Sequence, residues 1–449
     1  MDLDAFTELL TSRGRRALEE ARELRGADPV AAATRLRRTY DAALVSAALT
    51  QTALRERARA KFGADAELMF FTPHGLEQAT RADVAAHRAR RLTGCALPAP
   101  APDTLPAPNT APDMAPTPDM APAPDMAPAR DVAPASAGGL RVVDVCCGVG
   151  GDFLALARAG CVVDAVDADP LTVAVARANA EALGLADRIT VRVADAASVR
   201  PEDHDVLFAD PARRGARGRT FDPLAYSPPW PVVLDLVARS RRACLKVAPG
   251  IPYAFIPDGA EAEWVSVRGE VKEASLWIAS GASGASGASG ASGASGASGP
   301  VARRATLLPG GHTLAATGAA APVGPLGRYV YEPDGAAIRA HLVGEVAELV
   351  GGRLPDPMIA YITGDEPVDT PWAARYEVAE ALPFSLKRLR AALRERHIGN
   401  VTIKKRASAV DIERLRADLR LSGDKSGVVI LTRVLDKPSA LICHPTPPA

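Results

Sequence analysis

The 449-residue chain lacks the features that mark several classes of protein. Its 53 basic and 53 acidic side chains give a formal net charge of zero, so the whole chain has no basic surplus of the kind that coats a polyanion. No run of about 18 apolar residues is present to cross a bilayer. The acidic start, MDLDAFTELL, also has no signal-peptide pattern. We therefore expect a cytoplasmic protein without a membrane partner.

Cysteine is scarce and scattered. None of the six cysteines forms a C-x-x-C pair, and no histidine cluster accompanies them. A structural zinc site needs four ligands in close sequence pairs, so we predict no metal site. Cys244 lies in an apolar strand pattern, which favours a place in the core over a role as a nucleophile. Unpaired cysteines also fit a reducing compartment.

Two low-complexity runs divide the chain. Residues 93–138 repeat proline- and alanine-rich units, which predicts a disordered linker, and residues 279–299 repeat Ala-Ser-Gly as a flexible insertion. We expect an N-terminal helical region over 1–92, a central domain over 139–312 that contains the insertion, and a third domain over 323–449.

The stretches on either side of the insertion, EVKEASLWI and VARRATLLP, both have the composition of strands. We interpret them as an antiparallel pair whose hairpin tip is extended by the insertion. A longer flexible loop at such a tip adds only about 2 kcal/mol of chain entropy. The sheet should therefore tolerate it.

Residues 140–153, LRVVDVCCGVGGDF, are the most informative stretch. A β-branched strand ends near Asp144, glycines form a turn, and an apolar helix pattern follows. Glycines at such a turn let the backbone approach a ligand where a Cβ would collide. Asp167 ends a second strand about 19 residues past Gly148, where a carboxylate can bind both hydroxyls of a ribose. This pattern predicts an α/β fold with one nucleoside-binding half of a parallel sheet.

The loop lacks the G-x-G-x-x-G pattern of dinucleotide enzymes, and an acidic residue on its strand suits a cationic ligand better than a pyrophosphate. Here the chain resembles class I S-adenosylmethionine-dependent methyltransferases. That resemblance implies a Rossmann-like, seven-stranded domain with S-adenosylmethionine as cofactor. The cofactor-binding residues implied by the matching motifs, ADAASV among them, are Asp144, Cys146, Gly148, Gly150, Asp167 and Asp195. Cys146 replaces the usual first glycine, as in RNA-directed relatives that resemble the trimethylguanosine synthases.

The fourth strand, in DVLFADPARR, ends in Asp210-Pro211 at the edge where open α/β sheets bind ligands. Amine-directed members of the family have an Asp/Asn-Pro-Pro-aromatic motif there, which accepts hydrogen bonds from the target amino group. The resemblance makes Asp210 and Pro211 the candidate catalytic residues, although Ala212-Arg213 replaces the second proline and the aromatic ring. We interpret the nearby YSPPW as a helix start with Ser227 as its N-cap.

The N-terminal region is predicted to be helical. Asp28-Pro29 offers a cap and a first-turn proline for a second helix that continues to Ala47. An irregular stretch follows, in which some residues either face the site or pack on it, and packing is the favoured interpretation. These residues are Phe70, Phe71, Glu77, Gln78 and Thr80.

From about Val323 the chain becomes mixed α+β, with one helix predicted over 336–350. The basic helix after it and the strand VTIKKRA resemble the THUMP-like domain that is joined to bacterial methyltransferases. Since THUMP domains of the wider family dock RNA, the resemblance implies RNA as a partner. The implied RNA contacts are Lys387, Arg390, Lys404, Lys405 and Arg406.

The function predicted from these motifs is methylation of a base in tRNA or rRNA, on an exocyclic or ring nitrogen. The missing aromatic ring and the neutral charge favour an alternative, a methyltransferase for a small molecule or a protein. A catalytically silent RNA-binding protein that keeps the fold is a third possibility. The retained carboxylates of Asp144, Asp167 and Asp210 argue against that third reading.

Overall fold

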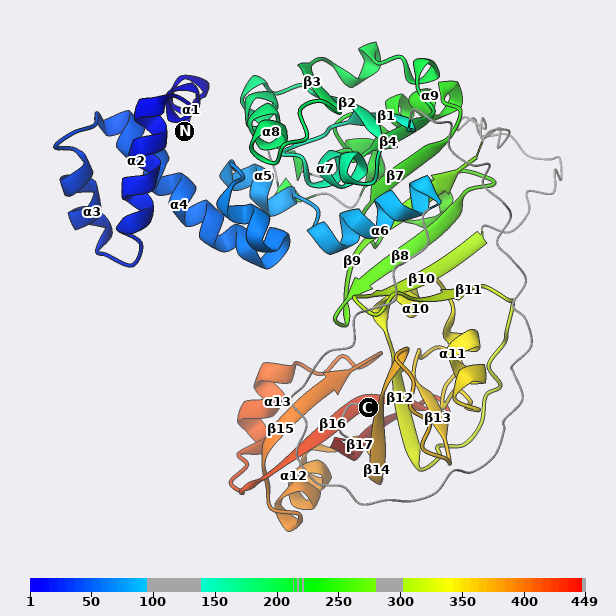
Figure 1. Cartoon of the computed structure of the whole chain (residues 1–449). Helices are drawn as coiled ribbons and strands as arrows, with labels where there is room; N and C mark the ends of the chain where they lie inside the picture. Colours follow the sequence, from blue (N-terminus) through cyan, green and yellow to red (C-terminus); the bar gives the residue numbers. More distant parts are fainter. Residues whose placement is uncertain (95–138, 213, 216–217, 220–221, 280–301, 446–449) are drawn as a thin grey trace, which may run out of the picture.

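The structure, a computed structural model, describes residues 1–94, 139–212, 214–215, 218–219, 222–279 and 302–445 (Figure 1). The predicted linker beyond residue 94 and the Ala-Ser-Gly repeat lie outside these residues. Within them, an N-terminal group of helices is followed by a large mixed sheet and then by a second, smaller sheet. No helix in the described part of the chain is long and apolar enough to cross a membrane.

The N-terminal region is helical, as predicted. Its α-helices are α1 (Leu3–Leu9), α2 (Ser12–Glu23), α3 (Pro29–Leu36), α4 (Ala42–Phe62), α5 (Pro73–Gln78) and α6 (Ala82–Thr93). The predicted second helix is in fact two. Asp28 caps α3 as expected, but α3 ends at Leu36, and the Asp41 side chain accepts a hydrogen bond from Leu44 N (3.0 Å) to start α4. The Asp41 cap is the local signal that the single-helix prediction overlooked.

The large sheet has the strand order β11-β10-β8-β9-β7-β4-β1-β2-β3. Its parallel part comprises β1 (Arg141–Val145), β2 (Val162–Asp167), β3 (Ile189–Val193), β4 (Val206–Ala209) and β7 (Ala243–Val247). Helices α7 (Gly151–Arg158) and α8 (Pro170–Ala182) cover one face together with the N-terminal helices, and α9 (Trp230–Arg239) covers the other. The carboxyl ends of the five parallel strands therefore meet at one edge.

The rest of this sheet corrects the predicted hairpin. Strand β8 (Glu261–Val267) pairs with β9 (Glu270–Ile278) through a two-residue turn at Arg268 and Gly269, both with positive φ (51° and 81°). Strand β10 (Ala302–Leu308) pairs in parallel with the other side of β8, and β11 (His312–Ala315) follows it. The segments before and after the insertion are therefore separated by β8, and the described sheet has nine strands rather than seven.

The reason for this error is not a missing strand signal, because β8 (EAEWVSV) alternates polar and apolar residues on either side of Trp264-Val265, where its register with β9 shifts. The alternation marks a strand but does not say which strand it pairs with, and β8 inserts between the two segments that the sequence suggested as partners. After β4, two short strands, β5 (Arg214–Gly215) and β6 (Gly218–Arg219), pair with each other and form a separate antiparallel ladder.

The C-terminal sheet has the order β13-β12-β14-β17-β16-β15. Its strands are β12 (Tyr329–Pro333), β13 (Ile362–Gly364), β14 (Ala373–Pro383), β15 (Ile398–Lys405), β16 (Lys425–Val434) and β17 (Lys437–Pro445). Helices α12 (Leu386–Glu395) and α13 (Ile412–Leu419) pack on one face of it. The helix predicted over 336–350 is two helices, α10 (Gly335–Arg339) and α11 (Val343–Leu349); α10 packs against β8, β9 and β10 of the large sheet, and α11 follows it in the same apolar cluster. His341, at φ 54°, lies in the break between them.

Candidate active site

A pocket lies at the carboxyl edge of the parallel strands. It combines the glycine loop after β1 with the ends of β2, β4 and β7 and with an N-terminal segment. Its lining residues are Gly75, Glu77, Gln78, Ala79, Thr80, Cys146, Cys147, Gly148, Val149, Gly151, Asp152, Asp167, Asp210, Pro211, Ala212 and Lys246. The structure thus brings five of the predicted site residues together, and their individual roles stay predictions. Gly150, Asp144 and Asp195 do not line the pocket.

The loop after β1 has the backbone that its glycines allow. Gly148 and Gly150 have φ values of 57° and 105°, and a Cβ at Gly150 would collide with the Phe153 ring. Cys146 is also in the left-handed region, at φ 64°. Asp167 holds the loop in place, since its Oδ2 accepts a hydrogen bond from Gly148 N (3.1 Å). Burial raises the pKa of Asp167 above its usual range.

Asp144 lies beneath this loop, fully buried, and neither of its carboxylate oxygens has a hydrogen-bond partner among the residues that the structure describes. Burial and the neighbouring Asp210 raise its pKa to about 8. A carboxylate in such a place is costly unless a cation approaches it. The donor set therefore fits a positively charged ligand such as a sulfonium. Asp195 is exposed instead, and its side chain accepts from Ala197 N (2.8 Å) at the start of a short turn.

Asp210 follows β4, and its carboxylate is paired with a lysine that sequence reasoning missed. Lys246 Nζ lies 2.5 Å from Asp210 Oδ2, and the lysine side chain is only 5% exposed. Among the described residues, the other oxygen of Asp210 has no partner. The signal that could have found Lys246 is a lysine inside the otherwise apolar strand ACLKV, since a charge is buried there only with a partner.

The N-terminal region supplies one wall of the pocket. The favoured interpretation, that the irregular stretch only packs on the site, is correct for Phe70 and Phe71, which are buried. It is wrong for Glu77, Gln78 and Thr80, which line the pocket. Backbone carbonyls of this segment, in α5 and just after it, are hydrogen-bonded to a side chain of α4.

Lys61 on α4 provides that support. Its Nζ donates to the carbonyl oxygens of Leu76, Glu77 and Ala79 at 2.7–2.9 Å. Burial, with Lys246 nearby, lowers the pKa of Lys61 to about 8.

A buried ionic network fixes the same wall to the sheet. Arg88 on α6 is 2% exposed and pairs with both Asp152 of α7 and Glu273 of β9. The second oxygen of Asp152 accepts from Thr80 Oγ1 (2.6 Å), which lies in the pocket lining. Nearby, His87 Nε2 lies 2.8 Å from the buried Glu263. Helix α6 is therefore held to the sheet by charge as well as by apolar contact.

Residues 226–230 lead into a helix, as interpreted, but Ser227 is not its N-cap. Helix α9 starts at Trp230 with Pro229 in the cap position. The backbone of Ser227 instead exchanges two hydrogen bonds with Ala212 (2.8 and 2.9 Å), which holds the chain just after Pro211. Arg213, which follows Ala212, lies outside the described residues.

The five predicted RNA contacts do not form one surface. Lys404 and Arg406 lie on one face of the C-terminal sheet, where Lys404 Nζ pairs with Glu332 (2.6 Å). Lys405 points to the opposite face and donates to Val410 O (2.9 Å). On α12, Lys387 is exposed, whereas Arg390 donates to the carbonyl oxygen of Asp418. Strand alternation thus separates the basic run that the sequence presented as a single cluster.

Comparison with known proteins decides the family. The chain is 32% identical to an uncharacterized S-adenosylmethionine-dependent methyltransferase of Mycobacterium tuberculosis. The alignment covers 88% of this chain and 96% of that protein, and the values are the same for the strains H37Rv and CDC 1551. This chain belongs to the S-adenosylmethionine-dependent methyltransferases. It is therefore an enzyme with S-adenosylmethionine as its methyl donor, and its acidic, glycine-lined pocket fits that cationic cofactor.

Three family models match parts of this methyltransferase. Residues 140–233 match the model of RNA cap guanine-N2 methyltransferases, residues 373–445 match a THUMP domain-like model, and residues 2–58 match a domain of unknown function. The resemblance to methyltransferases with a THUMP-like domain is confirmed.

Two further similarities cover very different shares of this chain. A solved structure assigned to a methyltransferase of Porphyromonas gingivalis W83 shares the fold, with a TM-score of 0.69 over 98% of this chain and 99% of its own at 19% identity. A 23S rRNA (uracil(1939)-C(5))-methyltransferase of Acidithiobacillus ferrooxidans is 39% identical over 84 residues, which cover 17% of this chain and 19% of that protein.

Proposed function

We propose that this methyltransferase modifies a base in RNA, on an exocyclic or ring nitrogen. The observation that carries the proposal is the position of Asp210, at the end of β4 beside the glycine loop, in a region similar to RNA cap guanine-N2 methyltransferases. The similarity of residues 373–445 to THUMP domains and the partial match to an rRNA methyltransferase support RNA as the substrate class.

Asp210 is proposed to orient the target nitrogen. Lys246 occupies its Oδ2 and leaves the other oxygen to accept a hydrogen bond from a substrate N–H. S-adenosylmethionine supplies an activated methyl group on its sulfonium. Holding the nitrogen in line with that methyl group can contribute roughly 7–11 kcal/mol toward the barrier. Pro211, which is buried, is proposed to fix the turn that presents Asp210.

The cofactor contacts predicted for Cys146, Gly148, Gly150 and Asp167 belong to the same proposal. Asp144 would act from beneath the loop through its charge, and Asp195 from the rim of the sheet. Lys404 and Arg406 are proposed to contact RNA from the face that looks toward the large sheet. Lys387, Arg390 and Lys405 would form a separate contact on the helical face.

The test is transfer of labelled methyl groups from S-adenosylmethionine to total RNA and, separately, to an RNA-free lysate. Both substrates come from a strain that lacks the gene. The Asp210→Ala variant is compared with a matched control, Asp235→Ala, whose exposed carboxylate lies on α9. We expect label in RNA that depends on Asp210 and not on Asp235, with calorimetric binding of S-adenosylmethionine intact in both variants.

The other results have distinct meanings. Label confined to the RNA-free fraction would refute an RNA substrate and favour a small molecule or a protein as the methyl acceptor. The absence of an aromatic residue after Pro211 is the sequence feature that favours this alternative. Loss of cofactor binding in Asp210→Ala would contradict the orienting role of Asp210. Digestion of labelled RNA to nucleosides then identifies the base.

A further inference from the structure

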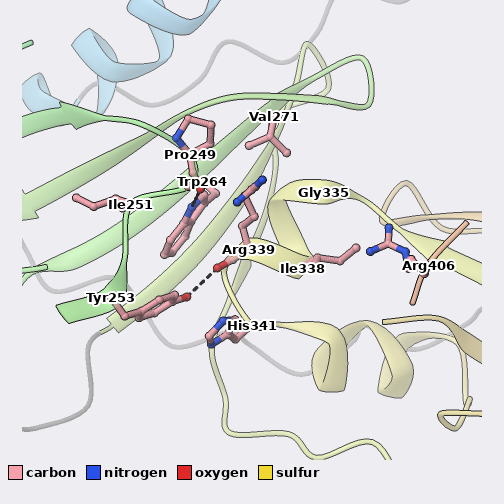
Figure 2. A pocket seen from close by; sticks show the side chains of 11 residues that line it. Pro249, Ile251, Tyr253, Trp264, Val271, Gly335, Ile338, Arg339, His341 and Arg406 are labelled. Atoms are coloured by element: carbon pink, nitrogen blue, oxygen red, sulfur yellow. Dashed lines mark hydrogen bonds between the residues drawn. The ribbon is translucent and has the colours of Figure 1, made fainter. Parts of the chain in front are cut away.

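A cavity of about 620 Å³ lies where α10 packs on the large sheet (Figure 2). Pro249, Tyr253 and Trp264 line it from the sheet side, and Arg339 and His341 line it from the end of α10. Its volume is in the range of about 300–1,000 Å³ typical of sites for small ligands. Nothing in the proposed methyl-transfer chemistry uses it.

Three rings in this cavity form one stack. Tyr253 is stacked on Trp264 (centroids 5.5 Å apart, planes at 25°) and on His341 (4.4 Å, 17°). The polar ends of the inner rings are satisfied: Tyr253 Oη donates to Arg339 O (2.8 Å), and Trp264 Nε1 donates to Pro249 O (3.0 Å). The stack is therefore rigid, and it ends in the exposed imidazole of His341.

His341 follows α10 in the left-handed region, at φ 54°, a conformation that histidine adopts more readily than most side chains. In this position its imidazole forms the exposed end of the ring stack. Burial and the nearby Arg303 lower the pKa of His341, which favours the neutral imidazole.

Cations surround the stack. The guanidinium of Arg339 lies over the Gly250 backbone, where an added Cβ would be 3.5 Å from its Nη1. A second cavity of about 1,070 Å³ shares Gly335 and Arg406 with the first and extends past Arg268. Within the described ranges, neither Arg268 nor Arg339 has a carboxylate at ion-pair distance. The two cavities thus adjoin as one cleft between the sheets. The carboxylates of Glu332, Asp334 and Asp369 also line it, but each already has a partner within the protein. The guanidinium groups of Arg268 and Arg339 are therefore the ones open to an anion.

This cleft begins close to the active site. Lys246 lines the catalytic pocket and Pro249 lines the cleft, and three residues span at most about 11 Å. The β8–β9 turn with Arg268 projects beyond the same edge of the sheet, because β8 runs parallel to β7. A chain that enters the pocket could therefore continue into the cleft.

We propose that this cleft binds a single-stranded RNA segment next to the target base. His341 stacks on a base, and Arg268 and Arg339 contact phosphates. Ring platforms with flanking cations are the usual means of holding single strands. The inference rests on the proposed RNA substrate, but its test measures binding rather than methylation, so the two can fail separately.

The test uses the full chain and a labelled 12-nucleotide single-stranded RNA of mixed sequence, with the same sequence as a duplex for comparison. His341→Asn keeps a residue that tolerates the left-handed backbone but removes the ring, and His341→Phe restores a ring. We expect affinity for the single strand to fall about 5-fold or more in the Asn variant and to recover in the Phe variant.

The arginines are tested through salt dependence. Arg268→Ala with Arg339→Ala should reduce the slope of log affinity against log salt by about 1.4, the contribution of two phosphates on a single strand. The matched control is Arg15→Ala with Arg38→Ala, which removes the same charge from exposed sites on α2 and just after α3. This control should leave the slope near that of the wild type.

Several results would overturn the proposal. Unchanged affinity in His341→Asn, with a lowered melting temperature, would show that the ring only joins the two sheets. If His341→Asn lowered the affinity for single-stranded and duplex RNA equally, His341 would not stack on an unpaired base. If the wild type bound no RNA, both this inference and the RNA substrate would fall. If RNA binding depended on the cleft but no RNA were methylated, only the proposed function would fall.

Discussion

The buried carboxylate of Asp144 gives the sharpest prediction. Its two oxygens have no hydrogen-bond partner in the described part of the chain, and its pKa rises from 3.8 to about 8 because burial disfavours the charged form. In the unfolded chain the group ionises near pH 4, so between about pH 4 and 8 the folded state holds one more proton than the unfolded state. Stability due to this group is therefore complete below pH 4 and is lost as the pH rises to 8.

The size of the effect follows from the same shift. Each pKa unit corresponds to about 1.4 kcal/mol, so the cofactor-free protein should lose roughly 6 kcal/mol from this group across that range. Asp144→Asn does not titrate. The difference in unfolding free energy between variant and wild type should therefore grow in favour of the variant as the pH rises.

Urea unfolding at pH 5, 6, 7 and 8 measures this difference, with the exposed carboxylate variant Asp195→Asn as control. The control should follow the wild type. Parallel profiles for Asp144→Asn and wild type would show that Asp144 is ionised in the free protein and would refute the reasoning.

The same group links cofactor binding to protons. A cation near Asp144 lowers its pKa, so S-adenosylmethionine binding at pH 7 should release up to about one proton. Calorimetry in buffers of different ionisation enthalpy counts these protons. Asp144→Asn should bind the cofactor more weakly and release none from this site, and proton release unchanged in the variant would assign it elsewhere.

Three other variants test the architecture of the pocket. Arg88→Met should destabilise the fold by about 3–5 kcal/mol in urea unfolding, because it leaves two buried carboxylates unpaired, and a further Glu273→Gln change should recover part of the loss. Lys61→Met should weaken S-adenosylmethionine binding by about tenfold in titration calorimetry, since three carbonyls of the pocket wall lose a charged donor; unchanged binding would mean that the wall is held otherwise. Cys146→Ala and Cys244→Ala should each retain methyl transfer in the labelling assay, because burial raises the pKa of both thiols, that of Cys244 to about 12; a large loss in either would indicate a thiolate nucleophile.

Local sequence was sufficient for the parts of the site that depend on neighbouring residues. The strand, glycine loop and helix around Gly148 are contiguous, and the parallel sheet places the ends of its strands at one edge. The approach of Asp167 and Asp210 to the loop therefore follows from topology. The helical N-terminal region and the mixed C-terminal part were predictable for the same reason, since each depends on periodicity within a short window.

The sequence-based predictions were wrong where contacts between segments distant in the chain determine the structure. Strand β8 has the alternation of a strand, but alternation does not name a pairing partner, and β8 separates the two strands that the sequence suggested as partners. The helix predicted over 336–350 breaks at His341, where the ring stacks on Tyr253 from another part of the chain.

The amino-acid sequence by itself thus determined the cofactor loop, the parallel sheet and the strand end that presents Asp210. Only the tertiary structure decided that Lys246 pairs with Asp210, that Arg88 joins carboxylates up to 185 residues away, and that the N-terminal segment forms a wall of the pocket. The physical reason is that periodicity and turn chemistry act over a few residues. A buried charge, in contrast, selects its partner from whatever the packed sheets bring within reach.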